Sequence, residues 1–86
     1  MGEVDTVIER LRARNPKASV QTLRLTAEAF VEYRTAQANI SEHGTIVFHP
    51  RTGAPIENPY LKIRDRARDS VLKLGARIST DCLWTD

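Results

Sequence analysis

Two histidines and one cysteine are the side chains best suited to acid–base, nucleophilic or metal chemistry. His43 and His49 flank a β-prone run, and Cys82 lies near the end of the chain. Neither histidine stands beside a serine or cysteine nucleophile in a recognisable motif, and Cys82 has no evident paired base. Two histidines alone also make a poor metal site. We therefore interpret both as surface turn residues.

The carboxylates and glycines do not form a catalytic pattern either. Asp65 and Asp69 lie one helical turn apart, but they alternate with Arg66 and Arg68, which is typical of ion pairs on a helix. The glycines lack the spacing of a phosphate-binding loop. We expect a protein that is not an enzyme and that binds neither a metal nor a cofactor.

Basic side chains give the strongest functional signal. Between Arg51 and Gly75 the chain carries six lysines or arginines against three acidic residues. Such side chains neutralise the phosphates of a DNA duplex without reading its sequence, and binding of this kind depends steeply on salt. The alternative interpretation is a solvated helix face. The residues predicted to contact DNA are Arg51, Lys62, Arg66, Lys73, Arg10 and Arg14.

Length and composition indicate one small globular domain over residues 1–86. The net charge of +2 is too small to establish a nucleic-acid partner by itself. A core this small usually needs additional stabilisation, for example by a disulfide or by oligomerisation, and the single cysteine cannot form an intramolecular disulfide. Self-association is the remaining means of stabilisation, so we expect a homo-oligomer.

Targeting signals are not evident. The N-terminus is charged, and no apolar run approaches the length of a membrane span. We expect neither a signal peptide nor contact with a membrane, and a cytoplasmic protein whose thiol is reduced.

The elements that must position these side chains are mainly helical. A short helix is predicted over 3–14, and it ends before Asn15-Pro16 because a residue that precedes proline is disfavoured in the helical region. A long helix over 18–42 follows. Ser19 is its predicted N-cap, and Gly44 is its predicted left-handed terminator.

The long helix carries two apolar faces that lie nearly opposite each other at about 100° per residue. A chain this short is not expected to bury both, so we predict that the second face contacts neighbouring subunits. The alternative is that this face rests on the N-terminal helix. The predicted oligomer interface consists of Leu25, Ala29, Tyr33, Ala36 and Ile40, together with Leu61 and Leu72 of the last helix.

The connector 44–58 and the helix after it complete the expected fold. Two short extended runs, 45–48 and 54–57, face each other across a turn-forming segment. Asn58-Pro59 then opens a basic helix over 59–74 with a capping side chain and a proline in the first turn, and Gly75 ends it. We predict a mainly α-helical fold, an antiparallel helical hairpin with a short β-hairpin-like connector and a short N-terminal helix.

The tail 76–86 carries three large apolar residues. Either Trp84 folds back onto the helices as a lid, or the tail is a docking peptide in which an exposed tryptophan serves as the anchor. The residues predicted for docking of a partner are Ile78, Leu83 and Trp84.

The order of these pieces resembles the small subunit of tailed-phage terminases. The resemblance covers about residues 22–75 and rests on Ser41–Val47, the turn Pro50–Gly53, the Asn58-Pro59 helix opening and the closing Lys73-Leu74-Gly75. It implies a non-enzymatic DNA-packaging protein of a phage, prophage or gene-transfer particle in the bacterial host cytoplasm. It also implies a ring of roughly eight or more subunits, with double-stranded DNA and the large terminase subunit, an ATPase and nuclease, as partners.

Two other functions are compatible with the same residues. A helical adaptor that binds a partner protein would not retain DNA. A small DNA-binding regulator would bind a specific sequence with two copies per site.

Overall fold

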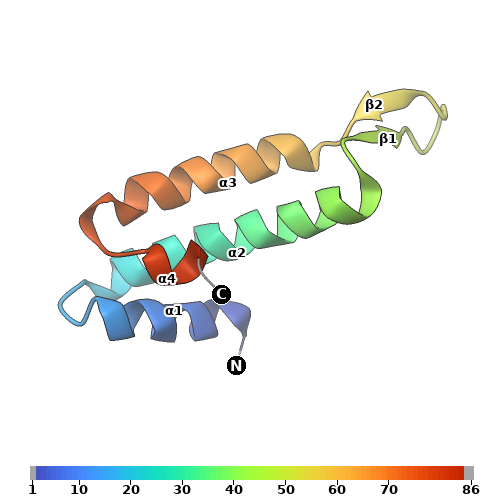
Figure 1. Ribbon diagram of the computed structural model, residues 1–86. Helices are drawn as coiled ribbons and strands as arrows, with labels where there is room; N and C mark the ends of the chain where they lie inside the picture. The colour runs from blue at the N-terminus through green and yellow to red at the C-terminus, as the bar shows by residue number, and fades with distance from the viewer. Residues whose placement is uncertain (1, 85–86) are drawn as a thin grey trace.

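The computed structural model describes residues 2–84; Met1 and residues 85–86 of the predicted tail lie outside this range. Within it the chain forms helices, one 3-10 turn and a two-stranded antiparallel hairpin (Figure 1). The elements are α1 (Glu3–Arg14), α2 (Val20–His43), β1 (Ile46–Phe48), β2 (Pro55–Glu57), α3 (Tyr60–Leu74), η1 (Gly75–Arg77) and α4 (Asp81–Trp84). The predicted fold class is confirmed. The short helix α4 in the tail was not expected.

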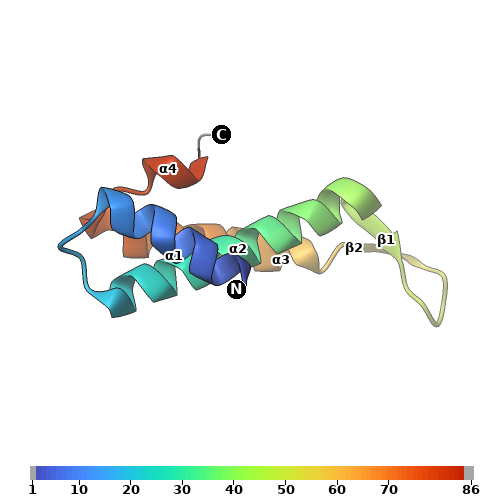
Figure 2. The same cartoon turned by 90° about the horizontal axis from the view of Figure 1, so that it is seen from below.

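Helix α2 lies at the centre, between α1 and α3 (Figures 1 and 2). Its start is fixed by Ser19, whose hydroxyl oxygen accepts the Thr22 N–H at 3.1 Å, as predicted for an N-cap. Its end is fixed by Gly44, whose positive φ of 84° favours glycine. The Gly44 N–H donates to the Ile40 carbonyl at 2.7 Å.

Both apolar faces of α2 are covered within the monomer. Leu23 and Phe30 belong to a core cluster that includes Leu11 of α1. Ala36 and Ile40, on the other face, are 1% and 7% exposed. Helix α3 runs along α2 on a different side from α1 (Figure 1). The prediction that these two residues contact a neighbouring subunit is therefore wrong. The reason is that α1 and α3 pack on α2 from different sides.

The other residues of the predicted oligomer interface differ in exposure. Ala29 and Tyr33 are half-buried and pack against the core cluster. Leu61 is half-buried, whereas Leu25 and Leu72 are exposed at 44% and 59%. Only the last three present surface of any size to another molecule.

A buried amide, Asn58, joins the hairpin to the helices. Its side-chain NH₂ donates to the Asn39 side-chain oxygen at 3.1 Å and to the Gly44 carbonyl at 2.8 Å. Its side-chain oxygen accepts the Tyr60 N–H at 2.9 Å, and Pro59 has helical backbone angles, so the predicted opening of α3 is confirmed. At 1% exposure, Asn58 has protein partners for both ends of its amide.

Gly75 ends α3 by a different mechanism from the one predicted. Its φ of −79° is not left-handed, and the chain continues into η1. A Cβ atom at this position would lie 2.7 Å from the Thr80 side chain. Glycine is therefore needed because the tail passes close to the backbone at the end of α3.

Replacing Asn58 with alanine is expected to lower the free energy of unfolding by about 1–3 kcal/mol, because the Gly44 carbonyl and the Tyr60 N–H lose their side-chain partner. Urea unfolding followed by circular dichroism measures the change. The control is Gln21→Ala on the exposed start of α2, which should change the stability by less than about 0.5 kcal/mol. Equal effects of the two substitutions would contradict the role assigned to Asn58.

Candidate nucleic-acid interface

Three cations form a strip along the outer face of α3. Lys62, Arg66 and Lys73 are exposed and follow one another at i, i+4 and i+11, which places them within about 40° of one another around the helix. The strip is about 16 Å long at 1.5 Å per residue. Among residues 2–84, none of the three has a carboxylate within ion-pair distance. These are the charges on α3 that remain available to an anionic ligand.

The other two arginines of α3 are already paired. Arg64 lies 3.1 Å from the Asp65 carboxylate and Arg68 lies 3.6 Å from it. Of the predicted ion pairing of Asp65 and Asp69 with Arg66 and Arg68, only the pair of Asp65 and Arg68 forms within the described residues. Asp69 forms no ion pair within the described range, and its spacing places it in the same strip as Lys62 and Lys73. The strip therefore carries three positive charges and one negative charge.

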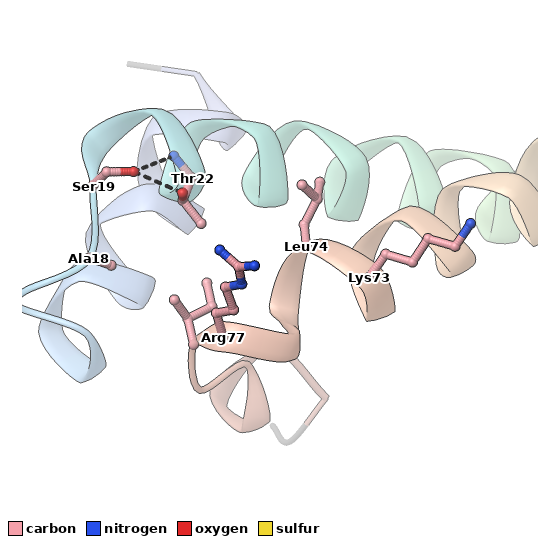
Figure 3. A pocket seen from close by; sticks show the side chains of 7 residues that line it. Ala18, Ser19, Thr22, Lys73, Leu74 and Arg77 are labelled. Carbon is pink, nitrogen blue, oxygen red and sulfur yellow. Dashed lines mark hydrogen bonds between the residues drawn. The ribbon is translucent and has the colours of Figure 1, made fainter.

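A further cation, Arg77, extends this surface beyond the end of α3 and was missed in the sequence. Arg77 and Lys73 line a hollow between the start of α2 and the end of α3, where the Arg77 side chain extends toward Thr22 (Figure 3). The N-terminus of α2 adds the positive end of the helix dipole to the same region. The signal was present in the sequence, since Arg77 follows Lys73 by four residues across Gly75.

Arg51 lies in the turn of the hairpin, away from the strip. The His49 ring nitrogen Nδ1 accepts the N–H groups of Arg51 and Thr52 at 3.1 and 3.4 Å, which shapes the turn. Arg51 itself is exposed. His43, the last residue of α2, lies 3.9 Å from the Glu42 carboxylate. The interpretation as surface turn residues agrees with the position of His49, whereas His43 is the last residue of a helix and does not lie in a turn.

The two arginines predicted on the first helix are separated from the α3 strip by α2 (Figure 1). The Arg10 guanidinium donates a hydrogen bond to the Cys82 carbonyl, so it holds the tail. Arg14 is exposed. The predicted DNA contacts therefore do not form one site: Arg10 has a structural role, and Arg14 faces a different side of the molecule from Lys62, Arg66 and Lys73.

The tail folds back onto the helices, which is the lid alternative. Asn15 clamps its backbone: the side-chain NH₂ donates to the Ser79 carbonyl at 2.9 Å, and the side-chain oxygen accepts the Ser79 N–H at 2.8 Å. Trp84 packs edge-to-face on Phe30 and Tyr33, with ring centroids 5.4 and 5.5 Å apart.

Two of the three residues predicted for partner docking therefore have core contacts. Leu83 is 7% exposed and belongs to the core cluster, so the prediction that it contacts a partner is wrong. Ile78 is half-buried against the same cluster. Trp84 remains 42% exposed.

Other kinds of site have no support in the described part of the chain. No group of three or more histidine, cysteine, aspartate or glutamate side chains there is placed to hold a metal ion. None of the helices it contains combines the length and apolar character needed to cross a bilayer.

Comparison with known proteins gives one match. A family model described as phage terminase, small subunit, matches residues 3–79, which is most of the chain. No curated protein and no solved structure gives a significant match. The matched range runs from the start of α1 to Ser79, where Asn15 clamps the tail.

Replacing Asn15 with alanine is expected to release the tail, because two hydrogen bonds to Ser79 are lost together. Trp84 is the single tryptophan, so its fluorescence reports the position of the tail. We expect its emission to shift to longer wavelength while the far-UV circular dichroism keeps its helical form. The matched control is Arg14→Ala on the same helix, which should leave the emission unchanged. A tryptophan spectrum unaffected by Asn15→Ala would contradict the clamp.

Proposed function

We propose that this chain, which belongs to the phage terminase small-subunit family, engages double-stranded DNA through α3 as a ring-forming, non-enzymatic packaging protein. Its family takes part in the packaging of phage DNA. The observation that carries the more specific proposal is the strip of unpaired cations on α3.

The geometry of the strip suits the backbone of a duplex. Lys62, Arg66 and Lys73 lie on an exposed helix over about 16 Å, and one DNA strand carries one phosphate for about every 3.4 Å of the duplex axis, so the strip can reach more than one phosphate. Among residues 2–84, these three side chains form no ion pair with a carboxylate, so DNA binding would not have to break one. Arg77 extends the same surface at the end of α3. Contacts of this kind hold DNA without selecting a sequence.

One copy of the strip would bind DNA weakly, and repetition around a ring would multiply the effect. Joining several weak sites raises the overall affinity because later contacts form within an already bound complex. This is the physical reason to connect the basic helix with assembly.

The shape of the chain supports assembly. Its accessible surface is 6181 Å², whereas a compact monomer of 9.7 kDa exposes about 5,100 Å². Its radius of gyration is 15.3 Å, against about 12 Å for a compact chain of this length. The excess of about 1,000 Å² is similar to the roughly 800 Å² that each partner buries in a standard interface.

The large terminase subunit is the proposed protein partner, and Trp84 is the residue of the tail best placed to contact it. The ring of Trp84 is held by Phe30 and Tyr33, so it is a fixed aromatic surface and not part of a loose peptide. Exposed, preorganised aromatic groups are frequent anchors of protein interfaces. We propose that docking regulates the activity of the large subunit.

Replacing Lys62, Arg66 and Lys73 together with alanine is expected to weaken retention of duplex DNA and to reduce its salt dependence. The slope of log affinity against log salt should fall by up to about 2.7 per subunit that contacts DNA, since each phosphate contact contributes about 0.9. Fluorescence anisotropy over a salt series measures both quantities.

The matched control removes the same charge from other elements. Lys17, Arg12 and Arg24 are exposed outside α3, and their triple replacement with alanine lowers the net charge equally. We expect this variant to keep most of the wild-type slope. If the two triple variants lose affinity to the same extent, net charge and not the strip is responsible. If neither the wild type nor any variant retains DNA, the helical adaptor is the better assignment.

Removing the one acidic side chain of the strip should have the opposite effect. Asp69→Asn keeps the size of the side chain and removes the repulsion of DNA phosphates. We expect affinity for duplex DNA to increase by a few-fold at low salt and the difference to disappear at high salt. An unchanged or lower affinity at low salt would show that DNA does not contact this face.

A further inference from the structure

The hairpin projects beyond the helices as an arm, which we define as residues 45–57. It continues past the end of α2 and past the start of α3, and its tip turns toward the side opposite α4 (Figures 1 and 2). The strands pair Ile46 with Glu57 and Phe48 with Pro55. Directly opposed residues point to the same face of a ribbon, so these four side chains share one face.

That face is unusually apolar for exposed surface. Phe48 is 70% exposed and Ile46 is 55% exposed. An isolated two-stranded hairpin is marginally stable in water and normally needs another surface against its apolar face. The arm therefore contributes to the excess of about 1,000 Å² over the surface of a compact monomer, and contact with another surface would stabilise it.

A second exposed strip runs along α3 beside the basic one. Leu61, Asp65, Arg68 and Leu72 follow one another at i, i+4, i+7 and i+11, so they share one line along the helix. Leu72 is 59% exposed and Leu61 is half-buried. This apolar strip lies about 100° around α3 from Lys62, Arg66 and Lys73, because each of its residues is offset by one position from the basic strip. A protein neighbour on one strip leaves the other free.

We propose that the arm of one copy packs on the apolar strip of the next copy, with Phe48 against Leu72 and with Glu57 facing Arg68. This inference rests on the proposed assembly of the protein and assigns the surfaces that build it. Besides the matching apolar residues, Glu57 can approach Arg68 as a second carboxylate beside Asp65, which already pairs with Arg68 at 3.6 Å. Glu57 has no ion pair within residues 2–84, and Arg68 is 48% exposed beside Asp65.

The arm and the strip are different surfaces of the same chain, so the contact is head-to-tail. Each copy uses its arm on one neighbour and its strip on the other, and such contacts close into a ring when the rotation between copies permits. The arm extends away from its own helices and leaves its own strip uncovered (Figure 1). A second copy is therefore the occupant that the geometry and the charges favour.

Two single substitutions test the contact. Phe48→Ser removes the apolar arm, and Leu72→Ser removes the apolar strip, both at exposed positions where the monomer fold does not depend on the side chain. Sedimentation velocity should show a large assembly for the wild type and monomers for each variant. Far-UV circular dichroism checks that the variants remain folded.

Mixing the two variants separates a head-to-tail contact from a symmetric one. The Leu72→Ser chain keeps its arm and the Phe48→Ser chain keeps its strip, so the mixture has one intact junction and should form a 1:1 dimer. A mixture that stays monomeric would overturn the head-to-tail assignment, whereas dimers of the Leu72→Ser chain on its own would favour pairing of arm with arm. Retention of the wild-type mass by Phe48→Ser would overturn the arm contact altogether.

Charge exchange tests the proposed ion pair. Glu57→Arg and Arg68→Glu should each reduce assembly, and the double variant should restore it. Failure of the double variant to recover, with both single variants folded, would overturn the pairing of Glu57 with Arg68. A wild-type assembly that is indifferent to all these changes contradicts this inference and leaves the proposed function standing, whereas a monomeric wild type contradicts both.

Discussion

The burial of α2 on two sides by its own chain is the constraint on which the rest of the structure depends. An 86-residue chain has few apolar residues for its core, and α2 supplies more of the buried ones than any other element. Helix α1 packs on α2 through its buried Val7, Ile8 and Leu11. The exposed pair of Glu3 and Arg34, at 3.2 Å, adds a weak surface contact. Helix α3 runs antiparallel along α2, in a register set by the hydrogen bond between Asn58 and Asn39. The core is closed without a second subunit, so assembly has to use residues that the core leaves out.

In the proposed assembly, the exposed surface of α3 is divided between DNA and a second copy of the chain. Ala67 and Val71 face α2 and are buried, which leaves most of the circumference of the helix in solvent. The basic strip carries unpaired cations. The apolar strip carries Leu61 and Leu72, with the ion pair of Asp65 and Arg68 between them. Because the two strips are separated by about 100°, DNA and a second subunit can approach the same helix from different directions. In this proposal, the arm that precedes α3 supplies the complementary surface.

The sequence was sufficient for the local structure and insufficient for deciding which apolar surface is free. Capping by Ser19 and Asn58 and the period of the apolar residues predicted the helices within two residues of their bounds, because these signals act over one or two turns. The two apolar faces of α2 were also recognised. Their assignment was wrong for Ala36 and Ile40 because it depends on where α1 and α3 pack, which involves contacts distant in sequence. The same limitation applies to Leu83, which packs in the core cluster. The tail that carries it is held at Ser79 by Asn15, 64 residues earlier in the sequence. Exposure of Phe48 could not be predicted, since a β-prone run is equally compatible with a covered strand.

The native mass of the wild-type protein, measured from micromolar to nanomolar concentration, tests the central claim most directly. That claim is that the chain closes its own core and assembles through surfaces left outside it. The account predicts an assembly of roughly eight or more copies at micromolar concentration, dissociating on dilution into monomers that keep their helical circular dichroism. A well-folded monomer at every concentration would contradict the assembly. An assembly whose subunits unfold as they separate would contradict the closed core.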